Sequence, residues 1–343
     1  MDKVLLIGAI NRDQVPTGGQ EAKNQILIQW LNQKADLRVI DTKSWKKKPW
    51  ILFRILFSIL KHQDHIILSL SSLSAFRVIQ LLKFFDRQEK TIYLVVGGWF
   101  PDMLKENPRK VKWYHSLKWI YVQSHSMVES LKALGLSNSG YLPNFKFIDL
   151  ELAQWIPKVS VGSKKFLYLS RIDEEKGARL VIEAIEALNH EGIFPELSVD
   201  FYGYVREDFR PYFMDKVESL PYIHYKGVID LRDKQNYLEL AQEGYYGFLF
   251  CSSYIGEGFP GAILDAMILG IPVIASDWNF NKEVVRDKTD GLIVPPKSVE
   301  ELKDAIHFFV RNPERVREMA LNIKKNSANY DADKVLENLM NGL

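Results

Sequence analysis

The 343-residue sequence lacks features that define several common classes of protein. Its single cysteine, Cys251, excludes an internal disulfide framework and a cysteine-rich zinc site. The longest apolar stretch, from Pro49 to Leu60, is broken by Arg54 and is shorter than the roughly 20 residues of a membrane-spanning helix. The N-terminal residues enter a strand-like run at once, without a signal-peptide pattern. We therefore expect a cytoplasmic protein, either soluble or attached peripherally to the inner face of the cell membrane.

The chain also lacks the usual motifs of metal and dinucleotide sites. Its seven histidines show no HxxxH or HExxH spacing, so we predict no metal site and no cofactor. The Asp-x-Asp segment at Asp331 and Asp333 lies at the start of a helical pattern, where helix capping explains it better. No GxGxxG follows Gly8 and no GxxxxGK[ST] is present, which argues against a dehydrogenase.

The charges are few in total but unevenly distributed. A formal net charge of +2 argues against a strongly basic protein, and we expect no nucleic-acid partner. Residues 1–150 hold 22 basic and 12 acidic residues, whereas residues 151–343 hold 23 and 31. The front half is therefore basic and the back half acidic, which indicates two parts with different roles.

Short apolar runs of strand-like composition alternate with helical patterns along the chain. Strands are expected at residues 4–9, 38–41, 66–69, 91–96, 118–122 and 140–142, and again at 166–170, 197–202, 223–225, 247–250, 273–275 and 291–294. Apolar strands separated by helices indicate parallel sheets covered on both faces. The polar stretch 154–165 reads as part of a linker. We therefore expect two α/β domains, residues 1–147 and 148–327, with a last helix in 328–343 packed back onto the first domain.

The first segment with candidate binding residues runs from Ser170 to Gly177, between a predicted strand and a predicted helix. It places two cations, Arg171 and Lys176, beside a helix N-terminus, where cations oppose the helix dipole. This placement favours an anionic ligand, because a guanidinium holds phosphate oxygens bidentately and an ammonium neutralises charge. An equally good alternative is a solvated loop in which both cations pair with the acids at positions 173–175.

A second segment, from Gly256 to Ala266, also lies between a predicted strand and a predicted helix. Its glycines allow close approach of the backbone, and Pro260 suits the first turn of a helix. The N–H groups of Gly258 to Gly261 would then face a ligand. Glu257 and Asp265 are about two helical turns apart, which predicts that both carboxylates lie on one side and read sugar or ribose hydroxyls. Alternatively, they are a helix-start acid and a polar residue of a buried helix, where an acid is costly without a partner.

A weaker candidate is the glycine pair Gly18-Gly19 in the segment from Thr17 to Gln20, after the first strand and before the first helix. Two glycines there can expose backbone amides to a phosphate or a sugar. A plain flexible loop explains the same residues.

Together these segments resemble the retaining glycosyltransferases of family 4, known as glycosyl transferases group 1, of the bacterial surface-polysaccharide type. The C-terminal half carries most of the likeness, and the N-terminal half shares only the layout. The motifs are Ser170-Arg171 with Lys176-Gly177, EGFPGAILDAMILGIPVIAS from Glu257 to Ser276, Glu283 followed by Asp290 to Pro295, and, more weakly, Gly18-Gly19 and Tyr141 to Asn144.

This resemblance implies the α/β fold called GT-B, in which two Rossmann-like domains face each other across a cleft. The N-terminal domain would bind the acceptor and the C-terminal domain the nucleotide-sugar donor. Glu257 would hydrogen-bond the donor sugar, and Asp265, where the family usually has glutamate, would bind ribose. Arg171 and Lys176 would hold the diphosphate and stabilise the departing nucleotide in place of a metal.

The resemblance also implies roles for several smaller groups. Ser170 and the backbone of Gly258, Phe259, Pro260 and Gly261 would contact the donor, and Gly18 and Gly19 would approach it from the other domain. In the loop from Gly97 to Asp102 this sequence has no histidine, where the family often has one. Gly98 and Asp102 are the candidate acceptor residues there.

Two basic segments of the front half are interleaved with aromatic residues. Lys43 and the run 46–48 precede the apolar stretch 50–57; the second set comprises Lys105, Arg109, Lys110, Lys112 and Lys118 with Trp113, Tyr114 and Trp119. Such segments suit the surface of an anionic membrane, which would deliver a lipid-linked acceptor. Single-stranded nucleic acid would suit the same composition. Apolar residues nearly all round 51–60 favour a buried helix, whereas the lysines favour attraction to a membrane.

The sequence therefore predicts a retaining enzyme that moves a sugar from a nucleotide-sugar to a lipid-linked saccharide in the assembly of capsule or another surface polysaccharide. Two alternatives stay open. One is a nucleotide-sugar epimerase on the same fold, and the other is a non-catalytic module that binds nucleotide-sugars or polyanions.

Overall fold

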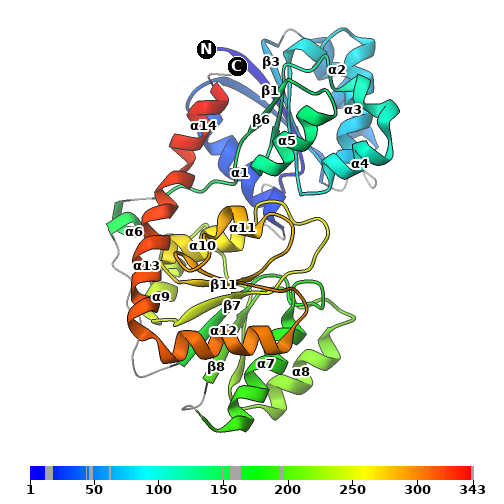
Figure 1. Cartoon of the computed structure of the whole chain (residues 1–343). Coiled ribbons are helices and arrows are strands. Elements are labelled where there is room, and N and C mark those ends of the chain that lie inside the picture. The colour runs from blue at the N-terminus through cyan, green and yellow to red at the C-terminus, as the bar shows by residue number, and fades with distance from the viewer. Residues whose placement is uncertain are drawn as a thin grey trace. The chain divides into compact units, whose positions relative to one another are not determined.

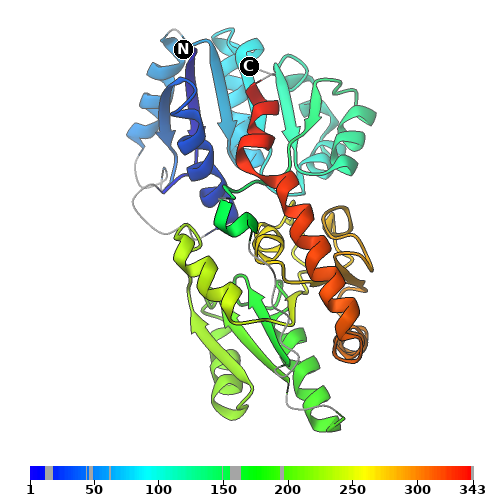
Figure 2. The same ribbon diagram turned by 90° about the vertical axis from the view of Figure 1, so that its left-hand side faces the viewer.

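The computed structural model in Figure 1 describes residues 1–11, 18–43, 45, 49–61, 63–148, 150–154, 164–193 and 197–340. The chain divides into two compact units. The first comprises Met1–Phe147 together with Tyr330–Leu343, and the second comprises Ile148–Asn329. The end of the chain thus returns to the unit in which the chain began (Figures 1 and 2).

The first unit is built on a parallel sheet whose described strands follow the order β2-β1-β3-β4-β5-β6. The strands are β1 (Lys3–Gly8), β2 (Asp36–Asp41), β3 (His65–Ser69), β4 (Thr91–Leu94), β5 (Trp119–Val122) and β6 (Ser139–Tyr141). Those at the centre are apolar and buried along their length, as expected for a sheet covered on both faces. β2 lies at one edge and alternates exposed with less exposed residues.

The helices of the first unit are α1 (Gly19–Leu31), α2 (Trp50–Leu60), α3 (Ser72–Phe84), α4 (Phe100–Glu106), α5 (His125–Ala133) and α14 (Ala332–Met340). Short 3-10 helices cover Gln88–Lys90 and Pro108–Trp113. Helix α14 packs its buried residues into the same core cluster as Val4 and Leu27. The Trp30 indole N–H of α1 also donates to Asp333 of α14 at 2.9 Å.

The second unit has its own parallel sheet, with the described strands in the order β12-β11-β10-β7-β8-β9. They are β7 (Lys164–Leu169), β8 (Leu197–Tyr202), β9 (Ile223–Gly227), β10 (Gly247–Phe250), β11 (Val273–Ser276) and β12 (Gly291–Val294). The helices are α6 (Leu150–Gln154), α7 (Ala178–Glu191), α8 (Arg210–Ser219), α9 (Lys234–Gln242), α10 (Gly261–Leu269), α11 (Asn281–Val284), α12 (Val299–Arg311) and α13 (Pro313–Ser327).

Every strand expected from the sequence is present, with small shifts at the ends. Two local expectations are wrong. The segment from Gly97 to Asp102 is not a loop throughout, because α4 begins at Phe100. The helix over 51–60 is not buried all round, because Leu52, Phe53, Phe57 and Leu60 are exposed. Most of the expected linker, residues 155–163, lies outside the described residues.

Candidate functional site

The candidate residues of the second unit lie in the loops that follow β7, β10 and β11. These three strands are parallel, and β10 is paired with both β7 and β11. The loops at their carboxyl ends therefore gather at one edge of the sheet, where α/β domains bind ligands. The order of the strands thus brings the loop after β7 close to the loops after β10 and β11, which lie about 80 and 100 residues further along the sequence.

The loop between β7 and α7 is held by buried polar groups. The Tyr168 hydroxyl donates to the carbonyl oxygens of Arg171, at 2.9 Å, and of Lys176, at 3.3 Å. The backbone N–H of Lys176 donates to the carboxylate of Asp173 at 2.8 Å, and Asp173 has no exposed surface. Burial raises the pKa of Tyr168 well above its usual value, so the hydroxyl stays a donor. The backbone that carries both cations is therefore fixed.

Gly177 allows this loop to pack against the end of β10. Its φ is +77°, a left-handed conformation, and a Cβ at this position would lie 2.3 Å from the carbonyl oxygen of Cys251. The backbone N–H of Ser253 in turn donates to the carbonyl oxygen of Glu175 at 2.8 Å. The two loops therefore form one connected piece of backbone, which only glycine at position 177 permits.

The cation Lys176 forms an ion pair with Glu257 across these two loops. The two side chains are only 12% and 10% exposed. The Ser252 hydroxyl donates to the same oxygen of Glu257 at 2.8 Å. Lys176 therefore does not pair with the neighbouring acids 173–175, as the alternative of a solvated loop proposed, but with the acid of the second motif.

The contacts of Arg171 agree better with the alternative of a solvated loop. Its guanidinium pairs with Asp173 and, at 3.3 Å, with Glu175. Arg206, from the loop after β8, approaches the same two acids at 3.9 and 4.0 Å. With 38% of its side chain exposed, Arg171 is accessible from solvent, and the Tyr254 ring lies 5.5 Å from it. Both cations of the first motif are thus balanced by carboxylates.

The loop between β10 and α10 differs in one respect from the expectation. Helix α10 begins at Gly261, and Pro260 is its N-cap with an extended backbone rather than part of its first turn. Glu257 therefore precedes the helix, as expected, and the helical period by itself does not relate its position to that of Asp265. Gly258 and Phe259 are buried, and Gly261 is half-buried at the helix start, where backbone N–H groups lack partners within a helix.

Asp265 is buried in α10 and has a partner from the neighbouring helix. The Tyr237 hydroxyl of α9 donates to the Asp265 carboxylate, which is 6% exposed. Burial, followed by the charge of Asp265, raises the pKa of Tyr237 well above its usual value. This hydrogen bond supplies the compensation that a carboxylate among apolar residues requires.

A third loop, between β11 and α11, supports the second motif and was missed by the sequence reasoning. The Trp278 indole N–H donates to the carbonyl oxygen of Tyr254 at 2.9 Å. The Asn279 amide donates to the carbonyl oxygens of Ile255, at 3.1 Å, and Glu257, at 3.0 Å. Both residues lie three or four positions after the predicted strand 273–275, so their place in the loop at the carboxyl end of a strand was the signal that could have found them.

In the first unit, Gly18 is the N-cap of α1 and accepts hydrogen bonds from the backbone N–H groups of Glu21 and Ala22. Among the described residues, a Cβ at Gly18 or Gly19 would meet nothing within 4 Å. Thr17 lies outside the described residues.

The candidate acceptor residues Gly98 and Asp102 differ in exposure. Gly98 is buried. Asp102 lies in the first turn of α4, where its exposed carboxylate pairs with Lys105 at 3.0 Å. Sequence reasoning missed a polar pair at the carboxyl ends of β1 and β3. Buried Asn24 of α1 accepts from the Ser69 hydroxyl at 2.5 Å and donates to the Ala9 carbonyl oxygen at 2.8 Å.

The two basic segments of the first unit have different surroundings. Lys43 pairs with Glu21, and residues 46–48 lie outside the described residues. In the second set, Tyr114 is not a surface aromatic but is buried against Tyr93 and Phe100.

Within the described ranges, no three His, Cys, Asp or Glu side chains lie close enough to hold a metal ion. No helix formed by the described residues combines the length and the apolar composition needed to cross a bilayer.

Comparison with known proteins identifies the family. Residues 151–329, more than half of the chain, match the family described as glycosyl transferases group 1. The chain belongs to this family. This match contains all three loops described above for the second unit.

Two curated relatives of this family member match part of the chain. The D-rhamnosyltransferase WbpZ of Pseudomonas aeruginosa is 24% identical over 55% of this chain and 45% of its own length. The N,N'-diacetylbacillosaminyl-diphospho-undecaprenol alpha-1,3-N-acetylgalactosaminyltransferase of Campylobacter jejuni is 25% identical over 67% of this chain and 60% of its own length. The chain thus spans less than two thirds of these curated relatives.

Among solved structures, HepE from Anabaena, in complex with UDP-glucose, matches 99% of this chain and 99% of its own length. The TM-score is 0.76 and the identity is 14%. This likeness concerns the fold, and with the two parallel sheets it confirms the expected GT-B class of two Rossmann-like α/β domains.

Proposed function

We propose that this protein is a retaining glycosyltransferase that uses a nucleotide-sugar donor. The observation that carries the proposal is the buried pair of Lys176 and Glu257, with Arg171 beside it, at the carboxyl ends of β7 and β10. The nucleotide-sugar found in HepE and the glycosyl acceptor named for the relative from Campylobacter jejuni support it.

The ion pairs suggest how a donor would bind. Lys176 and Arg171 are balanced by Glu257, Asp173 and Glu175. A diphosphate would take over the two cations and leave the Glu257 carboxylate to accept hydrogen bonds from the hydroxyls of the donor sugar. Because Lys176 and Glu257 are nearly buried, these interactions are stronger than they would be in water. The proposed donor contacts also include Ser170, Gly18, Gly19, Asp265 and the backbone of Gly258, Phe259, Pro260 and Gly261.

In the reaction, the bond between the anomeric carbon and the diphosphate oxygen breaks, and an acceptor hydroxyl oxygen bonds to the same face of that carbon while its proton passes to the departing diphosphate. Negative charge grows on the departing diphosphate, and Arg171 and Lys176 are placed to stabilise it. Two fixed cations can fill the role that a metal ion has at other diphosphate sites. We propose that the enzyme requires no metal or cofactor.

We further propose a lipid-linked saccharide as acceptor, in the assembly of a capsule or another surface polysaccharide. The relative from Campylobacter jejuni, whose name specifies a diphospho-undecaprenol acceptor, supports this choice. Gly98 and Asp102 of the first unit are the proposed acceptor contacts.

The decisive experiment measures nucleotide release from a panel of nucleotide-sugars with and without acceptor saccharides. Glu257→Gln and Arg171→Ala should each lower turnover by about 10²- to 10³-fold, the usual cost of removing one group that stabilises a transition state. Glu300→Gln and Arg315→Ala are matched controls, because both residues are exposed on α12 and α13 in local ion pairs. Unchanged turnover in the Glu257 and Arg171 variants would refute the assignment.

The products decide between the proposed function and its alternatives. NMR should show the new glycosidic bond with the anomeric configuration of the donor. Release of nucleotide without any acceptor, accompanied by an epimerised free sugar, would identify an epimerase. Saturable binding of a donor without turnover, in the presence of every acceptor tested, would identify a binding module.

A further inference from the structure

Helix α2 carries an unusual exposed apolar face. Its buried residues, which face the rest of the first unit, are Ile51, Ile55, Ser58 and Ile59. The opposite side, which we call the outer face of α2, consists of Trp50, Leu52, Phe53, Phe57 and Leu60, which are 50%, 52%, 74%, 62% and 52% exposed. Single exposed apolar residues are common in proteins, but five on one face of a helix indicate a surface that meets an apolar phase.

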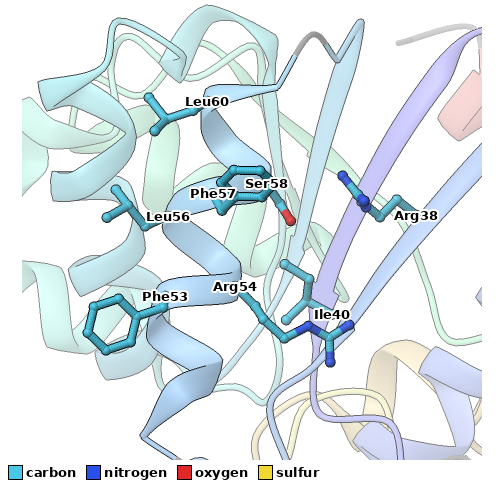
Figure 3. A pocket seen from close by; sticks show the side chains of 8 residues that line it. All are labelled: Arg38, Ile40, Phe53, Arg54, Leu56, Phe57, Ser58 and Leu60. Carbon is cyan, nitrogen blue, oxygen red and sulfur yellow. The ribbon is translucent and has the colours of Figure 1, made fainter.

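An open groove runs between this helix and the edge strand β2. Its volume is about 490 Å³, and Phe53, Phe57 and Leu60 contribute to its largely apolar walls. Figure 3 shows the guanidinium groups of Arg38, from β2, and Arg54, from α2, on one side of the helix, while Phe53 and Leu60 point to the other side. The groove thus combines an apolar wall with two cations at its rim.

The sequence segment that contains α2 is basic. From Lys43 to Lys61 it holds six basic residues and no acidic residue, and one of the six, Lys43, pairs with Glu21. Arg54 lies 5.5 Å from the Trp50 ring, and Lys61 lies 4.9 Å from the Phe57 ring. Both cations are therefore placed at the border of the outer face. An apolar face bordered by cations complements the surface of an anionic membrane, where acyl chains lie beneath phosphate groups.

We propose that the outer face of α2 docks the protein onto a bilayer that contains anionic phospholipids. The helix has 11 residues, so it is about 16 Å long and would lie in the plane of the interface. Phe53, Phe57 and Leu60 enter the outer part of the acyl region, while Arg38 and Arg54 contact lipid phosphates.

The charges favour a membrane over a second copy of the chain. A symmetric dimer through this face would bring the basic segment of one copy against the same segment of the other, and like charges across an interface are costly. A bilayer instead supplies the apolar phase and the negative charge together. This inference concerns the first unit alone, and it stands whether or not the second unit transfers a sugar.

The test is sedimentation with vesicles of equal parts phosphatidylglycerol and phosphatidylcholine, compared with vesicles of phosphatidylcholine alone. Phe53→Ser with Phe57→Ser should lower the partition coefficient about tenfold or more, because two largely exposed rings lose their burial in lipid. Arg54→Glu should lower it by at least about fivefold, the effect of one basic charge near an anionic surface. Binding should weaken as salt is raised.

Matched control variants come from the second unit. Phe308→Ser with Leu321→Ser removes exposed apolar side chains from α12 and α13, and Arg315→Glu makes the same charge change on α13. These variants should bind vesicles like the parent protein. Because the substituted side chains of α2 point to solvent, the melting temperature of each variant should stay close to that of the parent.

Three outcomes would overturn the proposal. The first is no binding to anionic vesicles, and the second is equal loss of binding in the α2 variants and their controls. The third is a dimer in light scattering that the double phenylalanine variant abolishes, since a second copy would then occupy the face. Nucleotide release with a water-soluble acceptor should be unaffected by the α2 variants, so failure here would leave the proposed function standing.

Discussion

Gly177→Ala is expected to destabilise the second unit and to displace the loop that carries Arg171 and Lys176. The new Cβ would lie 2.3 Å from the carbonyl oxygen of Cys251, and 2.8 Å from its carbonyl carbon and from its Cβ. The contact atoms are mostly backbone of the end of β10, which cannot move aside as a flexible side chain can. Either the loop from Arg171 to Gly177 or the end of β10 must therefore shift to make room for the new methyl group.

The magnitude follows from two contributions. A residue with a Cβ in the left-handed region costs about 1–2 kcal/mol. Forcing an extra methyl group into a packed site costs a further 1–3 kcal/mol, approximately. We therefore expect Gly177→Ala to lower the free energy of unfolding by about 2–5 kcal/mol, a large part of the roughly 5–15 kcal/mol of a typical domain.

The same helix provides a matched control. Gly192, at the C-terminal end of α7, has φ +65°, and a Cβ there would meet no described residue within 4 Å. Gly192→Ala therefore carries the cost of the left-handed backbone without the overlap. The loss of flexibility in the unfolded chain is the same for both variants and cancels in the comparison. The difference between them isolates the contact with Cys251.

The assay follows the reaction of the Cys251 thiol with an alkylating reagent in increasing urea. This is the only cysteine of the chain, it is buried, and burial raises its pKa to about 12, so it reacts when the second unit opens. Gly177→Ala should react at markedly lower urea than Gly192→Ala, and it should bind the nucleotide of the donor more weakly. Equal midpoints for the two variants would refute the reasoning.

Two further predictions concern buried polar groups. Tyr237→Phe should cost about 1–3 kcal/mol of unfolding free energy, because the Asp265 carboxylate loses a donor. Tyr246→Phe should be nearly neutral in the same urea titration, since the buried Tyr246 hydroxyl has no hydrogen-bond partner in the part of the chain that the structure describes. Similar losses in both would contradict this. Burial lowers the pKa of Lys324 from 10.5 to about 8. The unfolded chain therefore binds more protons between pH 8 and 10.5, and stability should rise with pH across this window by an amount on the order of 2 kcal/mol. Lys324→Met should make that rise smaller by this amount, while Lys23, whose pKa burial lowers to about 7, continues to contribute to it. An unchanged pH dependence in this variant would contradict the assignment.

The order of strands and helices could be predicted because it depends on local patterns of apolar residues. The partners of the candidate site residues could not, since they come from segments distant in the sequence. Lys176 and Glu257 are 81 residues apart, and the parallel pairing of β7 with β10 brings their loops together. Asp265 and its donor Tyr237 lie on different helices, so no spacing rule within one helix connects them.

Helix α2 shows the limit of composition as a guide to burial. Apolar residues nearly all round a helix usually indicate a core position, and the sequence alone cannot show how many neighbouring elements cover it. Because α2 packs beside the edge strand β2, only one of its sides is covered, and five large apolar side chains remain exposed. The basic residues around the stretch were the better signal.

The return of the chain to its first unit affects the order in which the protein can fold during synthesis. The second unit is continuous, so all of its residues have been made by position 329. The core of the first unit also needs Val335 and Leu336 of α14, which pack with residues near the N-terminus. The synthesis of the first unit therefore starts before that of the second unit, but its core is completed later. On the ribosome, the apolar sheet of the first unit is fully covered only after α14 has been made.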